Sequence, residues 1–342
     1  MKNKIAYLTK ERKFDLANEN IGKLGKDFVL VKTAAAAICG SDLHLFRNAG
    51  LGTHKLKLPV SLGHECSGIV VDSNKTKIRE GSLVAIDPLH SCIDKPNCKH
   101  QGLPRNLCPE QRYLGTSPQI GAFREFLVLH KSQVFEVNHL NPDEAAMIEP
   151  LSVVLHAINK VDIKNKKILI LGAGGIGSLL SAAIQKTNKN ITIIDKLGYR
   201  LNHANKFFKP LEIIKGSTTK IIKDSRNSYL SNKFDIIFDC ITNNSSFNLC
   251  NHFIRPAGKI VIVGIPEQDF IKINPHILRI KEISLINVRR SNINYKDCIK
   301  FHKKNKLPLK NLIIYKFNLE EIQTAFELND KYKKNIFRAA IV

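Results

Sequence analysis

The chain has 342 residues, of which 43% are hydrophobic and 24% are charged, the balance of an ordinary globular protein. Its length is comfortable for two domains, and its composition excludes a disordered chain, a collagen and a coiled coil. The 53 basic residues outnumber the 30 acidic ones, for a net charge of +23. Because the lysines are spread along the whole chain and no RNA-binding signature accompanies them, we expect no specific nucleic-acid binding.

No stretch predicts a membrane span or a secretory signal. The longest apolar runs have about eight residues, whereas a spanning helix needs roughly 20. Residues 1–15 carry charge but no apolar core, unlike a signal peptide. We therefore expect a cytoplasmic protein, whose eight cysteines are ligands or core residues rather than disulfides.

The first part of the chain, to about residue 145, has the pattern of short strands and turns. Residues 28–32 and 67–71 are strand-like, and residues 81–88 form a strand bounded by glycine and proline. This pattern predicts a small all-β barrel or sandwich. A helix is predicted from Asn141, which is a plausible N-cap before Pro142, and we expect it to break near Pro150.

From residue 166 the pattern changes to strand, glycine-rich turn, helix and strand, which is one βαβ unit. Further buried strands are predicted at 234–240, 258–266 and 282–288. Strands that alternate with helices of this length predict a parallel sheet with helices on both faces.

The turn at residues 172–177 matches the dinucleotide-binding pattern G-x-G-x-x-G. Gly172 permits the tight turn, Gly174 lets the backbone approach a pyrophosphate, and Gly177 allows close packing of helix on strand. The next strand ends at Asp195, 18 residues beyond Gly177, where a carboxylate would accept hydrogen bonds from the adenosine ribose. Since that carboxylate would repel a 2′-phosphate, the sequence favours NAD over NADP.

Two separate motifs offer metal ligands. Cys39 stands in CGSDLH, and His64 and Glu65 stand in LGHECSG. One thiolate, one imidazole and one carboxylate with an open fourth position are typical of a catalytic zinc rather than a structural one. Glu149, in MIEPLSVVLHA, is a candidate fourth or exchanging ligand.

With these motifs, the sequence resembles the zinc-dependent medium-chain dehydrogenases, and in particular their sorbitol (L-iditol) and L-idonate dehydrogenase branch. The resemblance covers essentially the whole length and also rests on GAFREFLVL (121–129), ILGAGGIG (170–177) and KEISLINV (281–288). It implies an α/β fold in which a doubly wound Rossmann sheet is inserted into a GroES-like β-barrel. The GroES-like catalytic domain would comprise residues 1–147 and 290–342, and the Rossmann domain residues 148–289.

The resemblance also implies roles for individual residues. Cys39, His64 and Glu65 would hold one catalytic Zn²⁺, which Glu149 would approach directly or through water. Asp42 would steady His64, while Ser41 and His44 would relay a proton to solvent. Besides the glycines, the positions that match NAD contacts are Ile176, Asp195, Arg200, Val263, Gly264 and Ile265. A homotetramer is the usual assembly of the family.

A second, structural zinc is not expected. The family often carries four cysteines in the spacing C-x2-C-x2-C-x7-C, whereas this chain has only Cys92, Cys98 and Cys108 in the spacing C-x5-C-x9-C, with Lys95 in place of a cysteine. His90, Asp94 or His100 could complete a site, but a lysine among the thiols disfavours a closed tetrahedral one. We therefore expect free thiols in this lobe.

The substrate pocket departs from the polyol pattern at two positions. Leu45 and Ser291 stand where sorbitol dehydrogenases carry tyrosine, whereas Arg290 is retained. An arginine suits a polyhydroxylated or carboxylated substrate, although Arg290 could instead contact only the cofactor.

The function that follows from the resemblance is hydride transfer from a secondary alcohol of a polyol or sugar acid to NAD. Other zinc enzymes of the same superfamily share most of the motifs and stay open as alternatives: an L-threonine 3-dehydrogenase, a simple alcohol dehydrogenase and an inositol-type dehydrogenase. The non-enzymatic alternative, suggested by the charge of +23, is a nucleic-acid-associated protein on a Rossmann scaffold.

Overall fold

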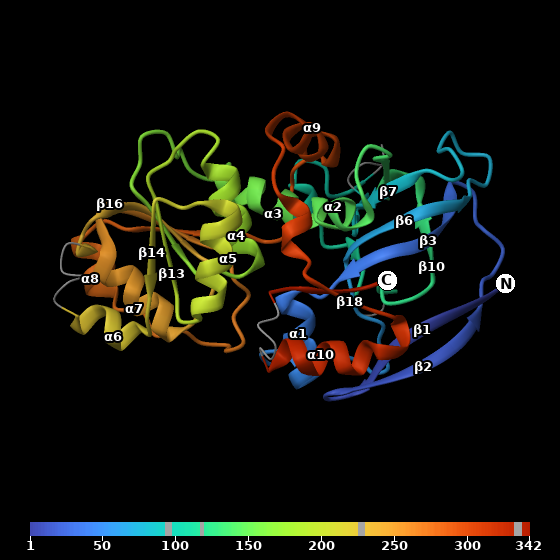
Figure 1. Ribbon diagram of the computed structural model, residues 1–342, viewed down its shortest axis with the longest axis horizontal. Coiled ribbons are helices and arrows are strands. Elements are labelled where there is room, and N and C mark those ends of the chain that lie inside the picture. Colours follow the sequence, from blue (N-terminus) through green and yellow to red (C-terminus); the bar gives the residue numbers. More distant parts are fainter. Residues whose placement is uncertain (93–97, 117–119, 225–229, 332–336) are drawn as a thin grey trace. The chain divides into compact units, whose positions relative to one another are not determined.

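The chain folds into two compact units in a computed structural model that describes residues 1–92, 98–116, 120–224, 230–331 and 337–342 (Figure 1). The first unit comprises Met1–Ser152, Asn292–His302 and Leu309–Val342, and the second comprises Val153–Ser291 and Lys303–Pro308. Two boundaries between the units fall inside helices: one lies in α3 (Ile148–Ile158) and one in α9 (Tyr295–Asn305). Within the described ranges, no helix combines the length and apolarity needed to cross a membrane.

A seven-stranded, mostly antiparallel sheet forms the frame of the first unit. Its strand order is β11-β7-β6-β3-β19-β18, and β10 also pairs with β3. The strands are β3 (Phe28–Ala37), β6 (Glu65–Asp72), β7 (Leu83–Ile86), β10 (Phe126–His130), β11 (Val134–Glu136), β18 (Tyr315–Phe317) and β19 (Ala339–Ile341). The strands predicted at 28–32, 67–71 and 81–88 are confirmed as parts of β3, β6 and β7.

Three strand pairs and several helices complete this unit. The pairs are β1 (Lys2–Lys10) with β2 (Lys13–Asn20), β4 (Gly50–Leu51) with β5 (His54–Lys55), and β8 (Leu89–His90) with β9 (Arg112–Tyr113). The α-helices are α1 (Gly40–Asn48), α2 (Pro142–Ala146) and α10 (Ile322–Asp330), and the 3₁₀-helices are η2 (Arg105–Leu107), η3 (Lys131–Gln133), η5 (Leu309–Leu312) and η6 (Leu319–Glu321).

Aromatic rings in the core of the first unit hold α1 in place. Phe46 of α1 packs against Phe326 of α10 with ring centroids 5.2 Å apart, and Phe326 also meets Phe123 at 5.5 Å. All three side chains are fully buried, and burial of a phenylalanine contributes about 2–3 kcal/mol. Helix α1, which follows Cys39, is thereby anchored by two distant parts of the chain.

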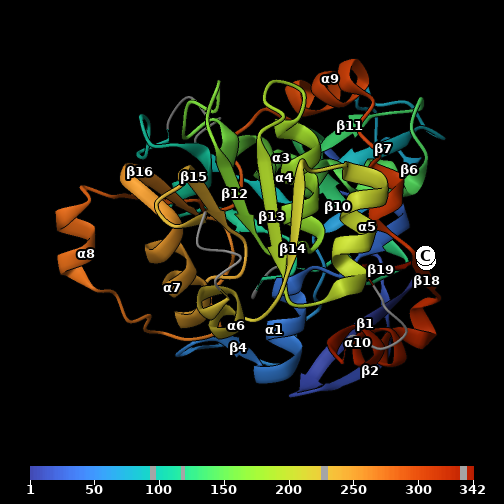
Figure 2. The same cartoon turned by 60° about the vertical axis from the view of Figure 1, so that its left-hand side comes forward.

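The second unit is built on a six-stranded parallel sheet in the order β14-β13-β12-β15-β16-β17. Figure 2 shows most of these strands side by side. They are β12 (Ile168–Leu171), β13 (Ile191–Asp195), β14 (Glu212–Lys215), β15 (Phe234–Asp239), β16 (Ile254–Ile262) and β17 (Ser284–Asn287). In chain order this is 3-2-1-4-5-6, the Rossmann arrangement, so the predicted doubly wound sheet is confirmed.

In the described part of the second unit, the sheet is accompanied by the helices α4 (Gly175–Ile184), α5 (Gly198–Phe208), α6 (Thr218–Lys223), α7 (Asn244–Phe253) and α8 (Pro275–Ile280). Strand β12 is buried at every position, which explains its continuous apolar run ILIL. The strands predicted at 234–240, 258–266 and 282–288 are confirmed as β15, β16 and β17, although β16 begins earlier, at Ile254.

The helical break predicted near Pro150 is wrong in position. Helix α2 ends at Ala146, and α3 begins at Ile148, so the break falls at Met147. Pro150 lies in the first turn of α3, where its missing N–H would have no partner within the helix anyway. The predicted N-cap is confirmed, because the Asn141 side chain accepts a hydrogen bond from the Glu144 N–H at 2.9 Å.

Candidate functional site

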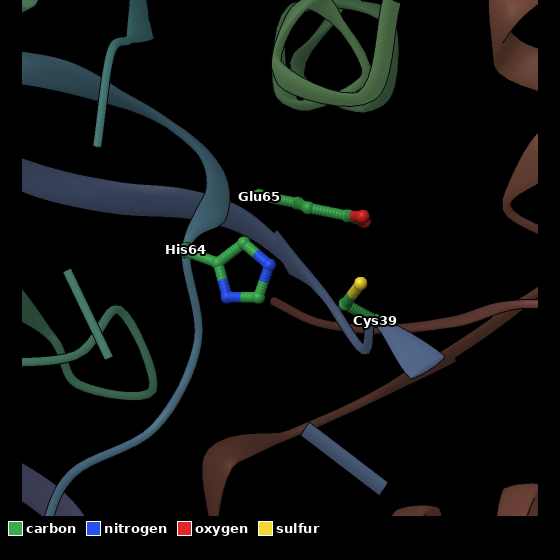
Figure 3. Close-up of side chains that lie close together, drawn as sticks. All are labelled: Cys39, His64 and Glu65. Atoms are coloured by element: carbon green, nitrogen blue, oxygen red, sulfur yellow. The ribbon is translucent and has the colours of Figure 1, made fainter. Parts of the chain in front are cut away.

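The three predicted zinc ligands lie together in the first unit. Strands β3 and β6 pair in a register that sets Ala37 opposite Glu65, so the end of one strand meets the start of the other. Cys39 follows Ala37 by two residues, and His64 precedes Glu65. One donor atom each from Cys39, His64 and Glu65 lies within 4.8 Å of the other two, and Figure 3 shows the side chains pointing toward one another.

Asp42 joins the two segments that carry these side chains. It is fully buried, and its Oδ2 accepts a hydrogen bond from the Cys39 N–H at 3.0 Å. Its Oδ1 accepts from the Gly63 N–H at 3.2 Å and lies 3.6 Å from Nδ1 of His64. A carboxylate in this place fixes both the start of α1 and the orientation of the imidazole.

Glu65 has one oxygen paired and one unpaired. Its Oε2 accepts a hydrogen bond from Nη1 of Arg338, and both side chains are almost completely buried. Its Oε1 is buried and has no hydrogen-bond partner in the described part of the chain. Because an unsatisfied buried oxygen costs free energy, this atom is suited to a cation on its open side.

The sulfur, nitrogen and oxygen donors fit zinc. Three protein ligands of these kinds are the set found in catalytic zinc sites, which keep a further position open. The unpaired Oε1 of Glu65 is the observation in this fold that favours an ion at the centre of the group. The residues present therefore match the metal that the resemblance implies.

The protonation of Cys39 and His64 depends on burial and on their neighbours. Burial raises the pKa of the Cys39 thiol, and the Glu65 carboxylate adds to this effect. Burial alone would lower the pKa of His64, but Asp42 and Cys39 outweigh it and hold that pKa well above 6.5. Without metal these groups therefore keep their protons, and binding of a cation would release them.

Glu149 lies beside Cys39, His64 and Glu65, but it is not one of the residues whose donor atoms all lie within 4.8 Å of one another. It is 5% exposed, and its Oε1 accepts a hydrogen bond from the Tyr113 hydroxyl at 2.8 Å. Burial raises the pKa of Glu149 to about 7, whereas His64 opposes the rise. The Tyr113 ring in turn lies 5.6 Å from the imidazole of His64, between centroids. Glu149 is thus a carboxyl group that can gain or lose a proton near neutral pH.

Ser41 and His44, the predicted proton relay, lie three residues apart on α1 and therefore on one face of it. Both side chains are partly exposed, which a path to solvent requires. Their relay role stays a prediction.

The glycine-rich turn of the second unit has the predicted geometry. Gly172 has a φ of 97°, which disfavours any side chain, and a Cβ at Gly177 would lie 1.8 Å from the Gly172 carbonyl oxygen. Gly174 is the N-cap of α4, and Arg200 brings a guanidinium nitrogen within 3.7 Å of where its Cβ would be. An approaching phosphate would meet open backbone and a cation here.

The other predicted cofactor residues also lie in the second unit. Asp195 is buried at the end of β13, and its oxygens accept hydrogen bonds from the N–H groups of Ala173 and Leu197, both at 2.8 Å. Ile176 lies in the first turn of α4, and the residues just after β16 are Val263, Gly264 and the exposed Ile265. Cofactor contact by these residues stays a prediction.

Of the residues predicted to define the substrate pocket, Arg290 follows β17 in the second unit and has a φ of 53°. Leu45 is 6% exposed and belongs to the apolar core of the first unit. Neither placement identifies a substrate.

The cysteine lobe is described in part. The three cysteines are free, and Cys92 lies next to both Cys98 and Cys108. Asp94 and Lys95, which the sequence placed among the thiols, lie outside the described residues.

Sequence reasoning did not find Arg338 or Tyr113. Arg338 meets a residue 273 positions earlier in the chain, and Tyr113 meets one 36 positions later. Neither stands in a motif, so no local signal could have identified it.

Comparisons with known proteins agree with this geometry. Residues 25–139 match the family described as "Alcohol dehydrogenase GroES-like domain", and residues 175–304 match "Zinc-binding dehydrogenase". Sorbitol dehydrogenase of Bacillus subtilis is 28% identical over 342 residues, which cover 99% of this chain and 96% of the relative. L-idonate 5-dehydrogenase of Vitis vinifera is 28% identical over 337 residues, with 95% and 91% covered.

A solved structure supports the same fold. An oxidoreductase/dehydrogenase of unknown specificity from Escherichia coli superimposes with a TM-score of 0.88 at 27% identity, covering 100% of this chain and 99% of that one.

Proposed function

Because the chain belongs to the zinc-binding dehydrogenases with a GroES-like alcohol dehydrogenase domain, we propose that it transfers hydride from a secondary alcohol of a polyol or sugar acid to NAD. The observation that carries this proposal is the group of Cys39, His64 and Glu65, whose donor atoms lie within 4.8 Å of one another. The unpaired Glu65 Oε1 supports a metal at its centre.

Zinc bound there would act as a Lewis acid that lowers the pKa of an alcohol hydroxyl. The residues around it have supporting tasks. Asp42 holds the imidazole of His64 in a fixed orientation, and Arg338 holds Glu65 through one oxygen and leaves the other without a hydrogen bond. Tyr113 positions the Glu149 carboxyl by donating a hydrogen bond to it.

The proton of the substrate hydroxyl leaves through the Ser41 hydroxyl and then the His44 imidazole. Their shared face of α1, directly after Cys39, supports this path. Proton transfer through positioned side chains is worth about 10²- to 10⁴-fold in rate.

The choice of NAD rests on Asp195. A buried carboxylate at the end of β13 accepts hydrogen bonds from ribose hydroxyls and repels a 2′-phosphate. The neighbouring Lys196 and Arg200 add positive charge, so the preference is one of degree and is measured by comparing the two cofactors.

The substrate class is supported by the names of the two relatives, sorbitol dehydrogenase and L-idonate 5-dehydrogenase. Arg290 would pair with hydroxyl or carboxylate oxygens of such a substrate. A homotetramer of two-domain subunits is the assembly we expect, and sedimentation of the purified protein tests it.

A substrate screen on the zinc-loaded protein tests the proposal. Polyols, sugar acids, L-threonine and simple secondary alcohols are offered with NAD or NADP, and formation of the reduced cofactor is followed by its absorbance. We expect turnover of a polyol or sugar acid with NAD. Turnover of L-threonine or of simple alcohols alone would assign the chain to another zinc dehydrogenase.

The metal dependence is tested with Cys39→Ala, which we expect to lose both zinc and turnover while still binding NAD. Cys66→Ala is the matched control, because Cys66 is adjacent to Glu65 but packs in the apolar core. Wild-type turnover by Cys39→Ala without bound metal would contradict the proposal.

A further inference from the structure

A second group of reactive side chains lies in the first unit, in the lobe between β8 and β9. The sulfur of Cys92 is 3.0 Å from the sulfur of Cys98 and 3.3 Å from that of Cys108. All three cysteines are free thiols. Sulfurs at these separations share hydrogen bonds and are close enough to bond with small movements of their side chains.

The fold holds these sulfurs together from both sides. Cys92 follows β8 by two residues, and Cys108 precedes β9 by four, while β8 and β9 pair with each other. Between them, Arg105 donates hydrogen bonds to Oδ2 of Asp87 at 2.5 Å and to the Leu89 carbonyl at 2.6 Å. Asp87 directly follows β7 and is almost fully buried, so this ion pair attaches the lobe to the end of that strand.

The spacing of the sulfurs differs from that of a metal site. Among the described residues, the only group whose three donor atoms all lie within 4.8 Å of one another is the one at Cys39. The three thiols therefore form a bent row with Cys92 in the middle, not a compact triangle around a common point. A tetrahedral ion needs the latter arrangement.

The hydrogen bonds shift the pKa values of Cys92 and Cys108 in opposite directions. The hydrogen-bonding contacts with Cys98 and Cys108 raise the pKa of Cys92 to about 12. Burial works to raise the pKa of Cys108, but hydrogen bonds from Ser91 and Cys92 outweigh it, so that pKa is lowered. The sulfur of Cys98 accepts a hydrogen bond from the His100 N–H at 3.3 Å. A thiol of raised pKa, Cys92, thus lies next to Cys108, whose lowered pKa favours the nucleophilic thiolate.

A small reagent can reach two of the three thiols. Cys92 and Cys98 are partly exposed, whereas Cys108 is fully buried. Cys92 also lines a cavity of about 590 Å³ together with Lys26, Arg112 and Tyr113.

We propose that Cys92, Cys98 and Cys108 form a reversible thiol–disulfide site, in which hydrogen peroxide or a related peroxide joins Cys92 to Cys98. The Cys98 thiolate attacks one peroxide oxygen, the O–O bond breaks, and sulfenic acid forms with release of hydroxide. The Cys92 sulfur then displaces the hydroxyl group and forms the S–S bond. In total, two thiols and one hydrogen peroxide give one disulfide and two water molecules.

Cys108 is the third partner in this site. Its sulfur lies 3.3 Å from that of Cys92, so its thiolate can attack Cys92 in the disulfide, form a Cys92–Cys108 bond and release the Cys98 thiolate.

The test treats the full-length, zinc-loaded protein with hydrogen peroxide, blocks the remaining thiols by alkylation and maps the peptides by mass spectrometry. Cleavage before Asp94 separates Cys92 from Cys98, so the cross-linked peptide is identified directly. We expect a Cys92–Cys98 disulfide that a dithiol reductant reverses, formed on the order of tenfold faster than oxidation of the partly exposed Cys240.

Three variants make the assignment specific. Cys92→Ser and Cys98→Ser are each expected to form no disulfide in the lobe, because the first lacks the resolving sulfur and the second lacks the attacking thiolate. Cys240→Ser is expected to behave as the wild type. Retained zinc at the Cys39 site shows that each variant is folded. The proposal is overturned if peroxide leaves all three thiols alkylatable, or if the lobe resists alkylation and releases one metal ion when its thiols are modified.

Discussion

Glu65 pairs with Arg338 through one carboxylate oxygen, and in the proposed site it would bind zinc through the other. Removal of Arg338 is therefore expected to have a metal-dependent effect on stability. In the metal-free protein, Arg338→Met leaves a buried carboxylate without its counterion, which costs about 3–5 kcal/mol of unfolding free energy. Zinc would compensate part of that charge, so we expect a smaller loss in the zinc-loaded protein. Chemical denaturation with and without a chelator measures the difference.

Arg255→Met is the control for this variant. Arg255 pairs with Asp235 at 2.6 Å, but its side chain is 40% exposed, and such pairs contribute about 1 kcal/mol or less. Equal losses for Arg338→Met with and without zinc would show that Glu65 does not face the metal.

Glu149 gives the metal-free protein a defined pH dependence. Its pKa is raised from 4.5 to about 7 by burial, so the folded state favours its protonated form. The stability that this proton contributes is complete below 4.5 and is lost as the pH rises through about 7. At about 1.4 kcal/mol per pH unit, the loss is about 3 kcal/mol.

Glu149→Gln removes this contribution while keeping the shape of the side chain. We expect its unfolding free energy, measured in denaturant from acid to neutral pH, to fall less steeply than that of the wild type. Parallel pH profiles of the two proteins would mean that folding does not raise the pKa of Glu149.

At the scale of single elements, the turn between β12 and α4 depends on glycine. A Cβ at Gly177 would lie 1.8 Å from the Gly172 carbonyl oxygen, so Gly177→Ala has to displace the turn or the helix. We expect lower thermal stability and at least tenfold weaker NAD binding, measured by calorimetry. Gly22→Ala, where nothing lies within 4 Å, is the matched control. Unchanged NAD affinity in Gly177→Ala would exclude this turn as the cofactor site.

The elements that the sequence predicted well are those with a local cause. The ILIL run, the glycine turn and the strand that ends at Asp195 follow from periodicity and backbone sterics, and the structure confirms them. The break at Met147 is predicted three residues too late, because two abutting helices and one interrupted helix have nearly the same pattern. In the candidate site, Cys39, His64 and Glu65 stand in motifs, whereas Arg338 and Tyr113 reach the site only through tertiary contacts.

At the scale of the whole molecule, the net charge of +23 attracts polyanions such as RNA, whatever the function of the protein. Charge attraction to RNA weakens steeply with salt because it depends on counterion release. We expect any RNA binding, measured by fluorescence anisotropy, to disappear by about 200 mM salt. Tight, sequence-dependent binding above that concentration would favour the nucleic-acid alternative over a dehydrogenase.

The proposed zinc site is tested most directly by X-ray absorption spectroscopy of the whole protein, loaded with one zinc per chain. Coordination by Cys39, His64 and Glu65 gives one sulfur at about 2.3 Å and nitrogen or oxygen ligands at about 2.0–2.2 Å. That pattern is the expected result. A zinc surrounded by three sulfurs would place the metal in the lobe of Cys92, Cys98 and Cys108, and a zinc without sulfur would exclude Cys39; either spectrum contradicts the proposed site.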